Sequence, residues 1–107
     1  MSRRIVILDS AQGEFRDIQK HVQRAFGTSV WREVLAEYKA SLERIQRNPE
    51  AGSPIDELKE VGIANVRFRL VRQTRVVYAF DDSRVIVHMF IHTRRDFRTH
   101  LLKRLLD

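Results

Sequence analysis

The spacing of the apolar residues changes along this chain of 107 residues, and that change restricts the folds it can adopt. After a short apolar run at the start, apolar residues recur every three or four positions as far as residue 45, as on one face of a helix. Residues 48–54, NPEAGSP, interrupt this pattern, because proline and glycine do not continue a helix. Beyond them, β-branched and aromatic residues form runs of strand length. This order predicts an α+β fold.

The N-terminal half is predicted to form a strand and a helical hairpin. Residues 4–9, RIVILD, are apolar on both faces, as in a strand inside a sheet. Ser10 is placed to cap a first helix, Gly27 to end it, and Thr28 or Ser29 to cap a second. Because so few residues separate the helices, they must fold back on each other. The predicted apolar stripes are Phe15, Ile18, Val22, Ala25 and Phe26 in the first helix, and Trp31, Val34, Leu35, Tyr38, Leu42 and Ile45 in the second.

The C-terminal half is predicted to form an antiparallel sheet. Residues 65–71, NVRFRLV, alternate apolar residues with arginine, which predicts one buried and one cationic face. Residues 74–80 and 84–92 are apolar on both faces, and DDS at 81–83 between them is typical of a tight turn. Helical spacing returns after the last strand. The predicted order is β-α-α-β-β-β-α, a helical hairpin packed on an antiparallel sheet with a short C-terminal helix, in one domain over residues 1–107.

The composition excludes several kinds of site. The chain has no cysteine, so disulfides, zinc–thiolate sites and thiol catalysis are ruled out. No apolar run approaches the ~20 residues that cross a bilayer, and the first ten residues are too weakly apolar for a signal peptide. No glycine-rich nucleotide-binding motif is present. We therefore expect a cytoplasmic protein that needs no cofactor.

The positive charge is concentrated in one half of the sequence. Residues 1–61 contain ten Lys/Arg and ten Asp/Glu, whereas residues 62–107 contain ten Lys/Arg and four Asp/Glu, which accounts for the whole net charge of +6. This asymmetry favours an anionic partner, either nucleic acid or an acidic protein segment. The alternative is that the arginines only keep a small domain soluble.

Several of these arginines are candidates for one binding surface. Arg67 and Arg69 share a strand face, Arg75 can join them from the next strand, and Arg94 and Arg95 follow the last strand. Guanidinium groups bind phosphates and carboxylates through paired hydrogen bonds. The alternative is that an amphipathic strand exposes them to solvent. The predicted anion-binding surface, called the basic surface below, comprises Arg67, Arg69, Arg75, His92, Arg94, Arg95 and Arg98.

The histidines raise two further possibilities. In a strand, a four-residue gap at roughly 3.3 Å per residue separates His88 from His92 by about 13 Å, so we predict no metal site. His100 lies near Arg98 in the predicted C-terminal helix. An imidazole there could move a proton while arginines hold a scissile phosphate, as metal-free RNA cleavage requires. The alternative is a surface histidine without a role.

Four segments, taken in order, carry a resemblance to a known family. They are IVILDSA at residues 5–11, the helical hairpin that ends in NPEAG, the pair RVVYAF and RVIVHMFIH, and HTRRDFRTHLLKRLL at residues 92–106. Over nearly its whole length the chain resembles the RelE/ParE superfamily of type II toxins, small proteins neutralised by a co-expressed antitoxin. The resemblance implies a toxin that inhibits growth.

The superfamily divides by target. In its long hairpin and its ending, the chain is more similar to the ParE branch, which implies inhibition of DNA gyrase and so of replication, plasmid stabilisation, and no enzymatic activity. The alternative is the RelE branch, whose members cleave messenger RNA on the ribosome without a metal and so inhibit translation. For that branch the resemblance implies Arg75, Arg94 and His100 as catalytic residues. The match is incomplete, because no lysine occurs between Lys59 and Lys103.

The resemblance also implies a cognate antitoxin, and possible hetero-oligomers with it. Its acidic C-terminal segment is expected to lie along the helical hairpin and the sheet and to cover the basic surface. Physically, an acidic disordered segment could pair with the arginines while burying an apolar anchor. On the hairpin, the expected contacts are Trp31, Leu35 and Tyr38.

Overall fold

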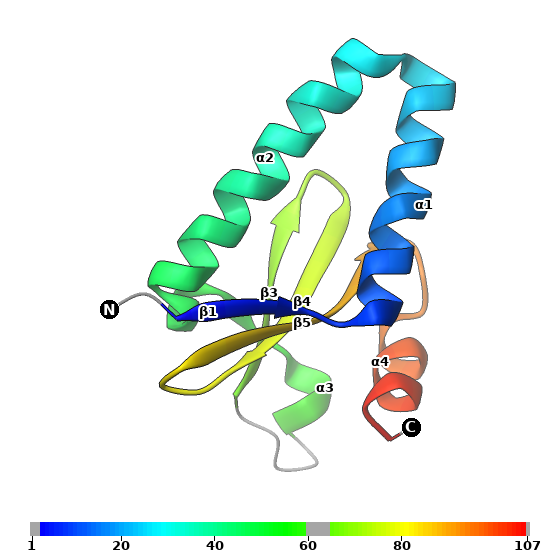
Figure 1. The fold of residues 1–107 in the computed structure, drawn as a ribbon. Coiled ribbons are helices and arrows are strands. Elements are labelled where there is room, and N and C mark those ends of the chain that lie inside the picture. The colour runs from blue at the N-terminus through cyan, green and yellow to red at the C-terminus, as the bar shows by residue number, and fades with distance from the viewer. Residues whose placement is uncertain (1–2, 60–64, 107) are drawn as a thin grey trace.

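In the computed structural model, which describes residues 3–59 and 65–106, helices cover both faces of a five-stranded sheet (Figure 1). The helices are α1 (Asp9–Phe26), α2 (Thr28–Arg47), α3 (Asp56–Lys59) and α4 (Phe97–Leu106). α1 and α2 form a hairpin on one face, and α3 and α4 pack against the other. The predicted class and element order are confirmed. Within the described residues, no helix is long and apolar enough to cross a membrane.

The sheet is mixed. Its strands are β1 (Arg4–Ile7), β2 (Ser53–Pro54), β3 (Val66–Val71), β4 (Thr74–Phe80) and β5 (Arg84–His92), and a 3₁₀ turn, η1 (Pro49–Ala51), precedes β2. They lie in the order β1-β5-β4-β3-β2. The predicted strands form antiparallel pairs, except that β1 pairs with β5 in parallel. Parallel strands cannot be joined by a tight turn and need a long connection. Here the chain between β1 and β5 starts with α1 and α2. β2 and α3 were not predicted, because they are too short to give a periodic pattern.

An aromatic cluster joins the hairpin to the sheet. The ring centroid of Phe15 in α1 lies 5.5 Å from that of Trp31 and 5.1 Å from that of Tyr38, both in α2. It also lies 5.1 Å from the ring centroid of Phe90 in β5. Such ring pairs contribute about 0.5–1.5 kcal/mol beyond their burial of area. The predicted apolar stripe of α2 is confirmed, because all its members are buried in this hairpin-side core or packed against it.

A second core lies on the opposite face of the sheet. Val77 of β4 and Met89 of β5 pack there with Phe97 and Leu101, which are one helical turn apart in α4. Leu58 of α3 completes this α4-side core. The C-terminal helix is therefore held on the sheet by apolar contacts.

The ends of the long helices differ from the prediction. α1 begins one residue before Ser10, α2 begins at Thr28, and no side chain caps either helix. Gly27 ends α1 as predicted, with a left-handed φ of 94° that favours glycine. The same residue is also the N-cap position of α2. The N-cap position of α1 is Leu8 and that of α2 is Gly27, so the caps predicted at Ser10, Thr28 and Ser29 are wrong.

Three apolar positions are exposed against expectation. Ala25 and Phe26 were predicted to be buried, but both are exposed, and Phe26 is 63% exposed. The reason is that the hairpin tip projects beyond the sheet (Figure 1). Leu70, predicted on the buried face of its strand, is 55% exposed. It lies at the edge of the sheet, beyond the two residues of β3 that pair with β2.

β4 and β5 change register at a β-bulge. Val77 pairs with Met89, but Tyr78 pairs with Val87, so His88 is the extra residue on β5. A bulge disrupts the ladder of backbone hydrogen bonds around the extra residue. At this bulge, side chains bond the carbonyl of His88 and the N–H of Phe90. Neither the bulge nor these bonds could be read from the apolar run of the strand.

Tyr78 ties the segment after α2 to the sheet. Its side chain is fully buried on β4, and its hydroxyl donates a hydrogen bond of 2.5 Å to the carbonyl of Pro49. Burial raises the pKa of Tyr78, which keeps the hydroxyl a donor. Gly52 is required beside it, because a Cβ at that position would lie 2.0 Å from the Tyr78 hydroxyl oxygen.

We predict that Tyr78→Phe lowers the free energy of unfolding by about 1–3 kcal/mol, because it leaves the carbonyl of a buried Pro49 without a donor. Urea denaturation followed by circular dichroism measures the change. Gly52→Ala, which places a methyl group against the hydroxyl, is expected to cost less in the Tyr78→Phe background than in the original protein. An unchanged urea midpoint for Tyr78→Phe would contradict this role.

A candidate binding groove between the helical hairpin and the C-terminal helix

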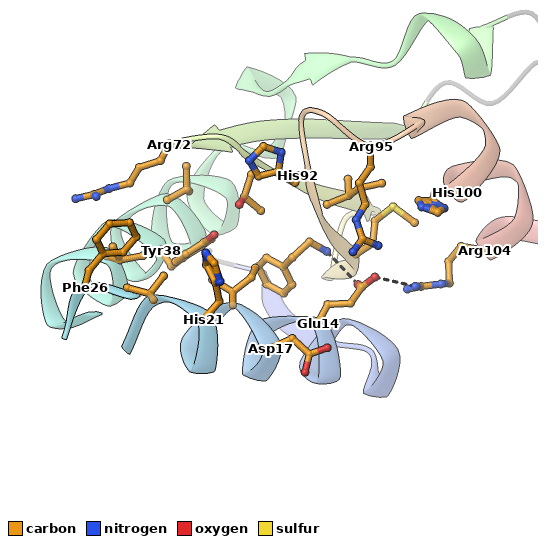
Figure 2. A pocket seen from close by; sticks show the side chains of 18 of the residues that line it. Glu14, Asp17, His21, Phe26, Tyr38, Arg72, His92, Arg95, His100 and Arg104 are labelled. Atoms are coloured by element: carbon orange, nitrogen blue, oxygen red, sulfur yellow. Dashed lines mark hydrogen bonds and ion pairs between the residues drawn. The ribbon is translucent and has the colours of Figure 1, made fainter. Parts of the chain in front are cut away.

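A groove of about 680 Å³ lies between the hairpin, one end of the sheet and α4 (Figure 2). α1 and α2 contribute one side of it. The turn between β3 and β4, the end of β5 and α4 contribute the rest. Residues separated by most of the chain, such as Glu14 and Arg104, therefore face the same cavity.

The floor of the groove is apolar. Tyr38 is buried there, and burial raises the pKa of its hydroxyl, while a hydrogen bond with the Thr74 side chain acts in the opposite direction. The exposed Phe26 lines the groove near the hairpin tip. When a partner covers an apolar surface of this kind, the removal of that surface from water favours binding. The apolar lining consists of Ile18, Val22, Phe26, Val30, Val34, Tyr38, Val71, Met89, Phe90 and Ile91.

The polar lining is mainly cationic. It has four Lys/Arg side chains and two carboxylates, an excess of two positive charges with histidine neutral. The cations lie at the β3–β4 turn, after β5 and on α4, and both carboxylates lie on α1. A groove with an apolar floor and a cationic rim suits an amphipathic, acidic peptide segment. The polar lining consists of Arg72, Arg95, Lys103, Arg104, Glu14, Asp17, Thr74, His21, His92 and His100.

Glu14 and Arg104 join α1, β5 and α4 at one end of the groove. Arg104 Nη2 donates to Glu14 Oε2 at 2.9 Å, and its Nη1 donates to the His88 carbonyl at 2.9 Å and to Ser10 Oγ at 3.0 Å. Glu14 Oε1 accepts the Phe90 N–H at 3.2 Å. The two charged side chains are 28% and 30% exposed, so solvent screens this pair less than a surface pair. This network, the Glu14–Arg104 latch, satisfies the backbone groups at the bulge. Figure 2 shows the contact between Glu14 and Arg104.

Arg72 lies at the other end of the groove in a strained turn. It is the first of two residues between β3 and β4 and has a left-handed φ of 54°, which is unusual for a residue with a side chain. Its guanidinium forms an ion pair of 2.8 Å with Glu37 of α2. The contact links the turn to the hairpin, although both side chains are well exposed and the pair adds little stability.

The histidines form no metal-binding cluster in the part of the chain that the structure describes. Burial, and then the positive charge of Arg104, lower the pKa of His88, so its ring is neutral at pH 7. His21, His92 and His100 line the groove from three different elements. His92 Nδ1 accepts the N–H of Arg94 at 3.0 Å, which shapes the turn after β5.

The sheet divides the basic surface. The cross-strand partners of Arg67 and Arg69 belong to the hairpin-side core, so both arginines lie on that face. The partner of Arg75 on β5 is Ile91, which belongs to the α4-side core. The prediction that Arg75 lies beside Arg67 and Arg69 is therefore wrong. Successive side chains alternate across a strand, and sequence alone did not fix the register between the two strands.

The guanidinium of Arg75 is stacked on two rings. Its central carbon lies 4.6 Å from the ring centroid of Phe97 and 5.4 Å from that of Phe68. Its Nε is buried and has no hydrogen-bond partner among the described residues. Cation–π contacts of this kind hold α4 against β3 and β4. Arg67 is also engaged, because its Nη1 donates to the Gly52 carbonyl at 3.0 Å.

The arginines after β5 remain available. Arg95 lines the groove, whereas Arg94 and Arg98 are exposed outside it. Among the described residues, no carboxylate forms an ion pair with any of the three. Asp96 is committed to α4, since it accepts hydrogen bonds from the Thr99 hydroxyl and N–H, which lower the pKa of Asp96.

The other predicted sites are only partly assembled. Arg75 lies under Phe97, Arg94 is outside the groove and His100 lines it, so the groove does not bring the three together. On the hairpin, Trp31 is 5% exposed and buried in the core, Leu35 packs against that core, and only Tyr38 lines the groove.

Sequence reasoning missed the contribution of α1 and of the end of α4. Glu14, Asp17 and His21 are spaced three and four residues apart, which places them on one helical face. That polar spacing was the available signal, but it does not reveal that Arg104 faces Glu14 from 90 residues away. Arg72 was missed because it lies in a turn without a turn-forming residue.

Comparisons with known proteins add to this geometry. A family model described as the ParE toxin of the type II toxin–antitoxin system parDE matches residues 5–97. The fold is similar to a solved structure of a chromosomal ParDE toxin–antitoxin system from P. aeruginosa, with a TM-score of 0.67. That match covers 87% of this chain and 98% of the other at 10% identity, so it supports the fold alone. Nothing matches among curated protein sequences.

We predict that Arg104→Ala lowers the free energy of unfolding by about 1.5–3 kcal/mol, because it removes charge-assisted hydrogen bonds and leaves Glu14 and the His88 carbonyl short of donors. Arg98→Ala, an exposed arginine on the same helix, should change it by less than about 0.5 kcal/mol. Urea titrations of both variants make the comparison. Equal midpoints would show that the latch adds no stability.

Proposed function

Because the chain belongs to the ParE family of toxins in type II toxin–antitoxin systems, we propose that it inhibits DNA gyrase and that an antitoxin neutralises it by occupying the groove. The match over residues 5–97 is the observation that carries this proposal. Gyrase as target rests on the resemblance of the hairpin and of the ending HTRRDFRTHLLKRLL to the ParE branch. The proposal places the toxin in the cytoplasm, where it arrests growth, and gives the pair a role in plasmid stabilisation.

The chemistry of the groove supports an antitoxin segment as its occupant. Apolar side chains of such a segment would cover the floor between α1, α2 and the sheet. Its carboxylates would meet Arg95 and Lys103, which have no carboxylate partner among the described residues. Bidentate pairing to arginine in a partly desolvated groove adds specificity as well as affinity. The complex would be a hetero-oligomer held at the groove.

The geometry gives less support to ribonuclease activity. Metal-free cleavage needs a base and cationic groups converging on one phosphate. Arg75 is stacked on Phe68 and Phe97, and it does not line the groove that His100 lines. We therefore propose a toxin that acts by binding its target rather than by breaking a bond.

Purified toxin is expected to inhibit the supercoiling of relaxed plasmid by gyrase and to increase the amount of cleaved DNA. The same preparation should leave protein synthesis in a reconstituted translation system unchanged. Gel assays with increasing toxin measure the first effect, and reporter yield measures the second. Unaffected gyrase at high toxin excess, together with arrested translation, would reverse the choice of target.

The groove is tested separately with the antitoxin encoded beside the toxin. The double variant Arg95→Glu, Lys103→Glu should bind it at least about tenfold more weakly, because two attractive contacts become repulsive. The double variant Arg94→Glu, Arg98→Glu changes the net charge equally but lies outside the groove. The affinity of this control variant for the antitoxin should stay within about threefold of that of the original protein. If calorimetry shows that both double variants lose affinity for the antitoxin equally, the antitoxin is attracted by overall charge and has no specific binding site in the groove.

A further inference from the structure

The outer edge of β3 is only partly covered. β2 pairs with β3 at two positions, Ser53 with Phe68 and Pro54 with Arg67. The chain before β2 belongs to the turn η1, and a hollow of about 230 Å³ remains between it and the rest of β3. Residues 51–53 and 68–70 line this hollow, and none of them lines the groove. The edge is therefore a second, separate surface.

The backbone of Leu70 points into this open edge. Val71 and Thr74 close a two-residue turn, so they form a hydrogen-bonded pair of the β3–β4 ladder. Alternation along the ladder then directs the N–H and C=O of Leu70 and of Phe68 away from β4. The position of the Phe68 oxygen agrees, since it lies 3.1 Å from a Cβ built on Gly52, on the β2 side. At Phe68 this side is paired with β2, whereas at Leu70 no strand of the described chain is present.

The side chains along the edge have different chemistry on the two faces. Leu70, 55% exposed, lies on the face that Phe68 also occupies. Arg69 lies on the hairpin side, and no carboxylate of the described residues pairs with it. A strand added here would place alternate side chains against an apolar face and against a cationic face.

We propose that an extended segment of a partner protein, alternating acidic and apolar residues, adds to β3 as a strand beside Leu70. Hydrogen bonds to the outward N–H and C=O of Leu70 supply affinity, as in other cases of strand addition. The acidic residues face Arg69, and the apolar residues cover Leu70 and the exposed part of Phe68.

A second copy of this chain fits the edge less well. Pairing two β3 strands would bring Arg67 and Arg69 of both copies onto one face, and like charges across a sheet are destabilising. An acidic segment has the opposite charge and removes this conflict. An unpaired edge with an exposed leucine is otherwise a liability for aggregation, which a partner strand would relieve.

Leu70→Pro tests the proposal, because it removes the outward N–H without removing a bond to β4, and proline is tolerated at such edge positions. Leu70→Ala is the matched control, since it loses the side chain but keeps the N–H. The probe is an acetylated and amidated octapeptide of alternating valine and glutamate, titrated into ¹⁵N-labelled protein. We expect the Leu70 amide signal of the unchanged protein to shift, and Leu70→Pro to bind at least about tenfold more weakly than Leu70→Ala.

Modified probes keep the test valid if Leu70→Pro does not fold. N-methylation of one alternate set of residues in the octapeptide should abolish binding to the unchanged protein, and methylation of the other set should not. The matching peptide with lysine in place of glutamate should not bind. Equal binding by both methylated peptides, or by the lysine peptide, would overturn strand addition by an acidic segment. A dimer of the unchanged protein that Leu70→Pro dissociates in sedimentation would also overturn it, in favour of a second copy.

Discussion

The Glu14–Arg104 latch is the contact on which the arrangement of the binding groove depends. The bulge at His88 disturbs the ladder between β4 and β5, and Arg104 and Glu14 bond the His88 carbonyl and the Phe90 N–H there. In doing so they connect α1 to α4 across the end of β5. Buried polar groups without such partners would cost more than a typical hydrogen bond contributes. The latch therefore satisfies backbone groups at the bulge and links the two helices that flank the groove.

The sheet also separates surfaces of different chemistry. On the hairpin side, apolar residues of α1 and α2 line the floor of the groove, and Arg95 after β5 and Lys103 of α4 lie at its rim. On the α4 side, Arg75 stacks on Phe97 and is part of the packing. Arginine count and charge asymmetry indicated an anionic partner, but the fold decides which arginines can meet it. A groove with an apolar floor and free cations at its rim is better suited to an acidic protein segment than to a bare phosphate chain.

Features set by short-range periodicity could be predicted from the sequence. The stripe from Trp31 to Ile45 defined α2, and DDS formed the expected turn, in which the Asp81 carboxylate accepts hydrogen bonds from two backbone N–H groups. Features that depend on strand register or long-range pairing could not be predicted. The face occupied by Arg75 follows from pairing between β3, β4 and β5, and the latch joins residues from opposite ends of the chain. The same limit explains why the groove was missed while several of its residues, among them Tyr38, Arg95 and His100, were predicted as candidates.

The central claim is that the antitoxin neutralises the toxin by filling the groove between the hairpin and α4. Hydrogen–deuterium exchange of the toxin, alone and in complex with its antitoxin, tests this most directly, because exchange slows where a partner covers or stabilises the backbone. The account predicts slower exchange in residues 14–26 and 93–104, which border the groove, and little change in the β4–β5 turn at residues 81–84 at the other end of the strands. Slower exchange confined to that turn and to β1, with the groove segments unchanged, would contradict it.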